Sequence, residues 1–125
     1  AGLLPLASLI KCGARLSFGS DWPVVSVDPL EGMAAAITGH DVRGTAFHPE
    51  QVIGVEYALQ GYSVHAAEVA GLDHVGSLGI GQTADFIAWS EDPFKFDWTQ
   101  GKPSIVATFM AGELVEGTLQ GAEAI

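Results

Sequence analysis

The first apolar residues of the chain recur at helical spacing, and a run that suits a strand follows them. The spacing in "GLLPLASLIKCG" predicts a helix whose apolar face is formed by Leu3, Leu6, Leu9 and Ile10. Lys11 suits the last turn, and Gly13 is placed to end the helix in a left-handed conformation. The run 15–19 shows too little polar alternation for a half-exposed strand, so we expect a buried strand that stops before Asp21. This order predicts an α/β protein with a parallel sheet.

The segment "DPLEGMAAAIT" predicts a second helix with a well-marked beginning. Asp28 can accept hydrogen bonds from the first free backbone N–H groups, and Pro29 suits the first helical position. Glu31 stands at the third position, where a capping box places an acidic residue. We therefore expect the helix to begin directly after Asp28.

The apolar pattern changes from helical to strand-like in the second half of the chain. The stretch 49–71 predicts two short helices, with Ser63 capping the second and Gly71 ending it. After this point "VGSLGIGQTADFIAWSEDPF" and "PSIVATFMAGELVEG" are rich in Gly, Val, Ile, Phe and Thr, which is typical of strands and turns. Ala111 and Gly112 lie between two such runs and predict a tight hairpin turn.

One apparent cofactor motif does not stand in the context that it requires. Gly79, Gly81 and Ala84 match G-x-G-x-x-A, the dinucleotide fingerprint. That motif needs a helix N-terminus after it to hold the pyrophosphate, whereas "ADFIAW" predicts a strand. We interpret these glycines as a turn between strands.

Composition and charge narrow the classes of function. The 125 residues are 48% hydrophobic and 16% charged, with a formal net charge of -10 and five Lys and Arg residues. This balance argues against binding to nucleic acid or anionic membrane, since both need clustered cations. The sequence has no apolar stretch near the roughly 18 residues that span a bilayer. We expect a cytoplasmic location, and the missing initiator Met suggests that Ala1 is a cut end.

The single cysteine adds little to this picture. Cys12 excludes an internal disulfide, and no base stands near it in the sequence. We expect a buried or half-buried structural thiol.

Four blocks carry a family resemblance when they are taken in order and spacing. They are "GARLSFGSDWPV", "PLEGMAAAIT", "ALQGYSVHAAEVAGLDHVGSLGIGQTADFIAWSEDPF" and "VATFMAGELVEG". Together they resemble the C-terminal end of metal-dependent amidohydrolases, and most closely amidohydrolase family 3, the subgroup that includes N-substituted formamide deformylases. The resemblance runs over essentially the whole chain, and the third block is its most specific part.

The resemblance implies the C-terminal fragment of a (β/α)8 (TIM) barrel followed by the C-terminal strands of a small β-sandwich domain. By that match, residues 1–70 are the C-terminal segment of the barrel, and "RLSFGSD" is its last strand. Residues 71–125 are the C-terminal share of the small β domain. Active sites of such barrels lie at the C-terminal ends of the strands. Asp21 follows such an end.

The resemblance also implies a role for Asp21, both as a metal ligand and as a catalytic group. In that role the aspartate takes a proton from water and passes it to the leaving amine, while a divalent metal, expected to be zinc, polarises the carbonyl. Without the resemblance, a turn carboxylate is the simpler interpretation. Trp22 and Pro23 follow Asp21 and are candidates for the substrate pocket, with plain aromatic packing as the equal alternative.

The sequence departs from the family pattern in its metal ligands. No His-x-His pair occurs, and we expect the four histidines to be packed or solvated residues rather than ligands: His40, His48, His65 and His74. Gly39 stands where many relatives are expected to carry an arginine. A catalytic zinc normally needs three protein ligands, so we expect the 125-residue chain alone to bind metal weakly and to be inactive.

Two functions from different classes follow from these observations. The first is part of a metal-dependent hydrolase that cleaves non-peptide carbon–nitrogen bonds, such as N-formyl amides. Its expected partners are a small-molecule amide substrate and either a second copy of the chain or an N-terminal part. The alternative is a non-catalytic acidic α/β interaction module that self-associates through exposed apolar surface. Neither function involves nucleic acid or a membrane.

Overall fold

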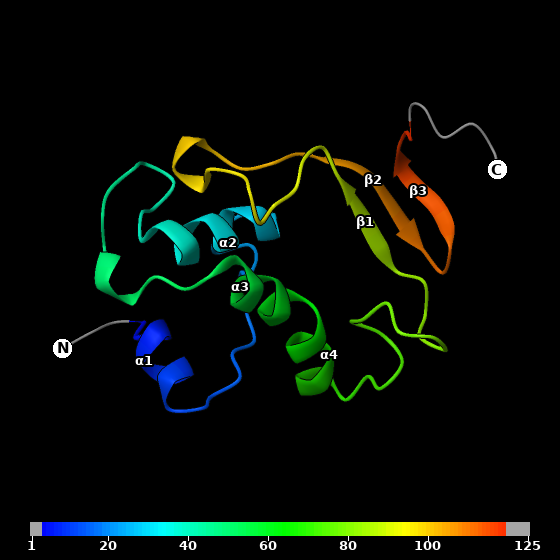
Figure 1. The fold of residues 1–125 in the computed structure, drawn as a ribbon, viewed down its shortest axis with the longest axis horizontal. Helices are drawn as coiled ribbons and strands as arrows, with labels where there is room; N and C mark the ends of the chain where they lie inside the picture. Colours follow the sequence, from blue (N-terminus) through cyan, green and yellow to red (C-terminus); the bar gives the residue numbers. More distant parts are fainter. Residues whose placement is uncertain (1–3, 120–125) are drawn as a thin grey trace.

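The computed structural model describes residues 4–119, so Leu3 and residues 120–125 lie outside the described part. The elements in chain order are α1 (Leu6–Lys11), α2 (Pro29–Thr38), the 3-10 helix η1 (Pro49–Gln51), α3 (Val55–Tyr62), α4 (Val64–Ala70), β1 (Phe86–Trp89), the 3-10 helix η2 (Trp98–Gln100), β2 (Ile105–Met110) and β3 (Glu113–Gly117). The helices gather at one end of the molecule and the strands at the other (Figure 1).

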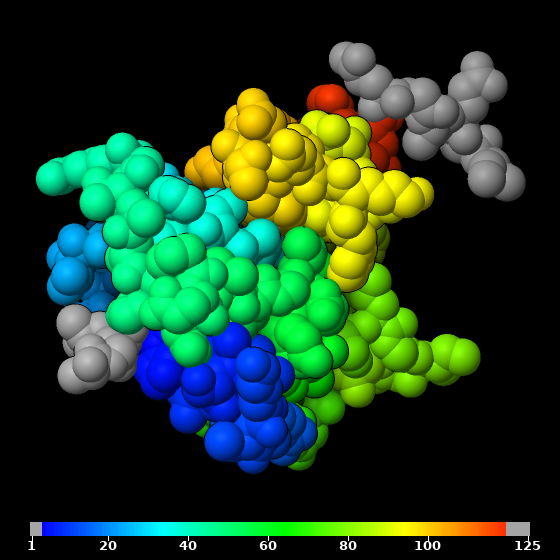
Figure 2. All heavy atoms as spheres, turned by 60° about the vertical axis from the view of Figure 1, so that its left-hand side comes forward, coloured from blue at the N-terminus to red at the C-terminus, as the bar shows by residue number. Residues whose placement is uncertain are grey.

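The core lies between α2, α3 and η2. Its buried members are Leu30, Met33, Ala36, Ile53, Ala58 and Trp98. The indole N–H of Trp98 donates to the carbonyl of Pro93 at 2.9 Å, so the buried ring keeps its hydrogen bond. Figure 2 shows the gold residues around η2 lying against the cyan α2. A segment from the strand-rich half of the chain thus completes the helical core.

The predicted helix boundaries are largely confirmed. Asp28 accepts from the backbone N–H of Leu30 at 2.9 Å, and α2 begins at Pro29. However, Glu31 does not complete the capping box, because the N–H of Asp28 donates to Ser26 at 3.2 Å. Glu31 instead lies 3.8 Å from the ammonium group of Lys102, where it gains an ion pair.

The helix ends follow the glycines that the sequence marks. Gly13 and Gly71 both adopt positive φ, at 84° and 71°; Gly13 is the second residue after α1, and Gly71 directly follows α4. The stretch 49–71 does break at Ser63. The hydroxyl of Ser63 does not cap α4 and instead donates to the carbonyl of Leu59 at 2.7 Å, because the last carbonyls of α3 lack helical partners. Cys12 is exposed, so the expected buried thiol is wrong.

The expected strand 15–19 is not formed. Residues 14–20 form neither a helix nor a strand, and the backbone N–H of Phe18 donates to the carbonyl of Gly61 in α3 at 3.0 Å. A strand exists only where a neighbouring strand completes its hydrogen bonds. In the described part of the chain this segment lies against helices instead. The buried barrel strand predicted from the apolar run is therefore absent here.

The sheet within residues 4–119 is antiparallel, with strand order β1-β2-β3, and it comes from the strand-rich half of the chain. The parallel sheet expected for the barrel part stays a prediction. Ala111 and Gly112 form the predicted turn between β2 and β3, with φ of 50° and 83°. The N–H of Ala111 donates to the carboxylate of Asp85 at 2.8 Å, just before β1. β1 follows Ala84, so the G-x-G-x-x-A stretch has no helix behind it, as predicted.

Among the helices of the described residues, none has the length and apolar character to cross a membrane.

Candidate functional site

Asp21 begins the turn that follows the segment 14–20. Its backbone adopts φ 51°, and its carbonyl accepts from the N–H of Val24 at 2.9 Å. Left-handed backbone is uncommon outside glycine, although aspartate tolerates it better than most residues. The side chain is exposed, and its carboxylate has no hydrogen bond or ion pair with residues 4–119. The turn therefore presents a free carboxylate.

A free carboxylate is chemically suited to one position in a zinc or other divalent-metal site. Within residues 4–119, no group of three or more His, Cys, Asp or Glu side chains is close enough to hold an ion. Asp21 thus fits one ligand of the expected metal, and the described chain places no second or third ligand beside it. The structure leaves the predicted metal and catalytic roles of Asp21 as predictions.

The residues after Asp21 form an exposed apolar loop. Trp22 is 68% exposed, and Val24, Val25 and Val27 are exposed as well. Pro23 is also exposed. Large apolar side chains that stand together in solvent are typical of a surface that contacts another molecule or another segment. Whether Trp22 and Pro23 line a substrate pocket stays a prediction.

The histidines are placed in three kinds of surroundings. His65 is part-buried, and its Nδ1 lies 3.0 Å from the carbonyl oxygen of Leu16. His48 contacts Glu50 at 2.8 Å, while the Nδ1 of exposed His40 lies 2.8 Å from the carbonyl oxygen of Thr38. His74 is exposed. None belongs to a metal-capable group of three within the described residues.

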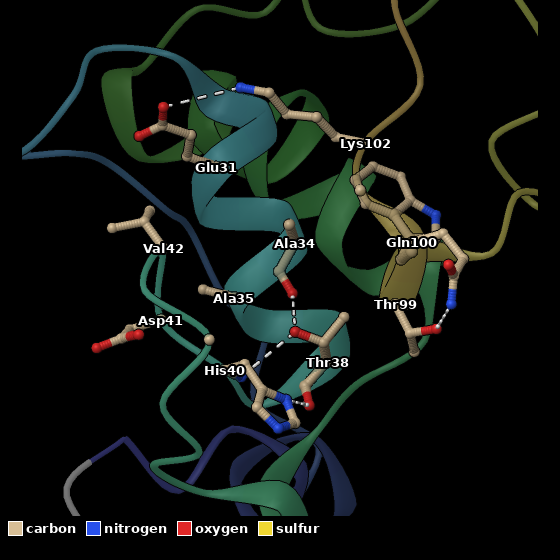
Figure 3. Close-up of a pocket in the computed structure, with 13 residues that line it drawn as sticks. Glu31, Ala34, Ala35, Thr38, His40, Asp41, Val42, Thr99, Gln100 and Lys102 are labelled. Carbon is tan, nitrogen blue, oxygen red and sulfur yellow. Dashed lines mark hydrogen bonds and ion pairs between the residues drawn. The ribbon is translucent and has the colours of Figure 1, made fainter.

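A cavity of about 710 Å³ lies between α2 and η2, and Asp21 is not among the residues that line it. Figure 3 shows that Ala34, Ala35 and Thr38 of α2 face it from one side and Thr99 and Gln100 from the other. His40, Asp41 and Val42 come from the loop after α2. Sequence reasoning missed this cavity, because its walls lie far apart along the chain and share no motif.

Two residues that line this cavity, Glu31 and Lys102, belong to an ion network. The ammonium of Lys102 contacts the carboxylate of Asp28 and lies 3.8 Å from Glu31. Partial burial of Asp28 acts to raise its pKa, but hydrogen bonds from Lys102 and Leu30 and the Lys102 charge outweigh this and lower the pKa below 3.8. Burial, and then the Asp28 charge, raise the pKa of Tyr62. Asp28 is therefore an ionised cap that ties α2 to the segment after η2.

The comparison with protein families decides the ancestry of the chain. Residues 1–116 match the family model described as "Amidohydrolase family", in the subgroup amidohydrolase family 3. The chain belongs to the amidohydrolase family. The predicted resemblance is thereby confirmed over nearly the whole length.

Individual amidohydrolase-family relatives match with moderate identity. The chain is 33% identical over 108 residues to "Protein LONG AFTER FAR-RED 3" of Arabidopsis thaliana, and the matched region covers 85% of this chain and 18% of that protein. It is 28% identical over 92 residues to the N-substituted formamide deformylase of Arthrobacter pascens, covering 73% and 17%. It is 32% identical over 122 residues to an imidazolonepropionase of Acinetobacter baumannii, covering 93% and 25%. The chain thus spans a quarter or less of these relatives.

The fold is also shared with a solved amidohydrolase from Thermotoga maritima MSB8. The TM-score is 0.67 at 23% sequence identity, and the match covers 90% of this chain and 26% of that one. The mixed helical and antiparallel arrangement is therefore that of about a quarter of an amidohydrolase structure. The complete barrel and β-sandwich remain expectations.

Proposed function

We propose that this chain is the Asp21-bearing part of a metal-dependent hydrolase that cleaves non-peptide carbon–nitrogen bonds of small amides. The observation that carries the proposal is the family match over residues 1–116. One relative is named for removing the formyl group of N-substituted formamides, which suggests an N-formyl or similar amide as substrate. Because the chain covers 17% of that protein, the rest of the site must come from other residues.

Asp21 supplies one carboxylate in this proposal. It would hold a divalent metal, zinc by its family, whose chemistry when bound is to polarise the scissile carbonyl and acidify water. The carboxylate can hold a proton and release it to a leaving amine, which departs poorly without one. The exposed position of Asp21 and its lack of protein hydrogen bonds within residues 4–119 leave both oxygens free for this work. In this proposal, Trp22 and Pro23, which follow Asp21, contact the substrate.

The test begins with the complete open reading frame that contains residues 1–125. We expect a His-x-His strand upstream in the same frame, since one ligand cannot hold a catalytic zinc. The encoded full-length protein should contain zinc and hydrolyse N-formyl amides. The 125-residue chain alone should neither retain zinc on gel filtration nor hydrolyse the substrate. A start codon directly before Ala1, or tight stoichiometric zinc in the isolated chain, contradicts the proposal.

The Asp21→Asn variant tests the residue itself. Asparagine tolerates the left-handed backbone and Asp21 has no protein partner in the described part, so stability should change by less than about 0.5 kcal/mol. Zinc content and kcat should fall at least about tenfold. Asp73→Asn alters another exposed aspartate and is the matched control. Equal zinc and activity in Asp21→Asn and wild type would remove Asp21 from the metal centre.

A second candidate function, a self-associating interaction module, is favoured by the exposed apolar side chains. Val42 is 79% exposed, and Val69, Leu78 and Ile80 are also exposed. Surface of this kind favours association with another copy or another segment. Light scattering of the 125-residue chain distinguishes the outcomes, because a clean monomer at high concentration contradicts self-association.

A further inference from the structure

The end of α3 and the start of α4 together hold the segment that leads to Asp21. The backbone N–H of Phe18 donates to the carbonyl of Gly61 at 3.0 Å, at the last turn of α3. One turn further along, the Nδ1 of His65 lies 3.0 Å from the carbonyl oxygen of Leu16. Since a carbonyl oxygen can only accept, His65 donates from Nδ1. The two bonds fix both sides of the same short stretch of backbone.

The contact between this segment and the helix is close. A Cβ on Gly61 would lie 2.3 Å from Cδ2 of Phe18 and 3.3 Å from the carbonyl oxygen of Leu16, so no larger side chain fits without a shift. The Phe18 ring also packs on Tyr62, with centroids 5.5 Å apart. The segment therefore rests directly on the backbone of α3, and His65 closes the contact on the α4 side.

The ion pair beside this contact is of a different kind. Arg15 and Glu68 approach to 2.7 Å, but their side chains are 68% and 43% exposed. Exposed pairs of this kind stabilise little, because solvent screens them. The part-buried hydrogen bond between His65 and Leu16 therefore restrains the segment more strongly than the exposed ion pair between Arg15 and Glu68.

We propose that His65 is a positioning residue for Asp21, acting through the backbone of Leu16 and Phe18. The inference rests on the proposed metal-centre role of Asp21. Three residues of extended chain span at most about 10 Å, so fixing Phe18 confines Asp21 to a small region. Loss of the His65 bond frees the carbonyl of Leu16 and lets the segment and its terminal carboxylate move. A ligand held by Asp21 would then be bound less tightly.

The experiment uses the full-length protein from the complete reading frame. His65→Leu keeps side-chain bulk and helix propensity but removes the donor. His65→Asn keeps a donor near the Nδ1 position and lacks Nε2. His74→Ala, on an exposed histidine, is the control. For each protein we measure hydrogen exchange of the peptide that covers residues 14–21 and the affinity for zinc by competition with a chelator.

We expect His65→Leu to raise exchange in the 14–21 peptide at least about fivefold and to weaken zinc about tenfold. His65→Asn should restore both to within about twofold of wild type, and His74→Ala should change neither. Unchanged exchange or unchanged zinc affinity in His65→Leu overturns the proposal. So does a failure of His65→Asn to restore them, which would point to a role for Nε2. If His65→Leu does not fold, His65→Ala takes its place.

The Asp21→Asn variant separates this inference from the proposed function. If the affinity for zinc falls in Asp21→Asn but not in His65→Leu, the proposed function stands and the proposed role of His65 is wrong. If the full-length protein binds no zinc, or if Asp21→Asn binds it as tightly as wild type, both the proposed function and the positioning role are wrong. The exchange measurement still shows in that case whether His65 restrains the segment.

Discussion

Gly76 is the position where a single added methyl group should test the packing of the loop after α4. Gly76 has φ 88°, and a Cβ there would lie 2.8 Å from Cβ of Ala67, 3.0 Å from the carbonyl oxygen of Ser63 and 3.1 Å from Cα of Val64. Gly71, at φ 71°, has open space around its missing Cβ. The two positions therefore share a left-handed backbone and differ in crowding.

The magnitudes follow from these two properties. A left-handed alanine costs about 1 to 2 kcal/mol, which is the expected destabilisation for Gly71→Ala. Gly76→Ala bears that cost and an overpacking cost of about 1 to 3 kcal/mol, because two of the three nearest atoms are backbone. The free energy of unfolding should thus fall by about 2 to 5 kcal/mol in Gly76→Ala.

Urea unfolding of the 125-residue chain, followed by tryptophan fluorescence, measures this difference, since Trp98 is buried in the core. The m-values of the variants should match that of wild type. If the two variants lose the same free energy within about 0.5 kcal/mol, the loop does not pack on α4 as described.

Two further predictions concern charge. The pKa of Asp28 is lowered because the hydrogen bonds and charge that favour its ionised form outweigh burial, so its stabilisation is complete above about pH 4 and is lost as pH falls through the lowered pKa. The free energy of unfolding should differ less between pH 7 and pH 3 in Lys102→Met than in wild type. An equal difference in the two proteins refutes this. Arg15→Gln should change the free energy of unfolding by less than about 0.5 kcal/mol, because the Arg15–Glu68 pair is exposed; urea unfolding in low salt checks it.

Local chemistry explains which features the sequence could predict. The start of α2 depends on Asp28 and Pro29, which act on neighbouring backbone groups, and the turn at Ala111 and Gly112 depends on those two residues. Gly39, where an arginine was expected in many relatives, ends α2 at φ 71°, with the Pro49 Cα 2.9 Å from its missing Cβ. The start of α2 and the turn need no knowledge of distant residues, whereas the close approach of Pro49 to Gly39 does.

The failures have the opposite cause. The run 15–19 has the same apolar pattern whether its neighbours are strands or helices, and the pattern does not say which. The bond between His65 and Leu16 joins residues 49 positions apart, so no local motif marks it. The cavity between α2 and η2 likewise forms from loops that meet only in the folded chain. For Asp21, the family resemblance located a candidate that turn propensity alone would have passed over.

The hydrogen bond that the N–H of Ala111 donates to Asp85 has a consequence for the order in which the strands assemble. β2 and β3 are joined by a two-residue turn, so their pairing is local and such hairpins form in about 1 to 10 µs. β1 must close the long connection through η2 before it can pair with β2. Because the formed turn sets the position of the Ala111 N–H that donates to the Asp85 carboxylate, we expect this bond to form last and to hold β1 on a hairpin that has already formed.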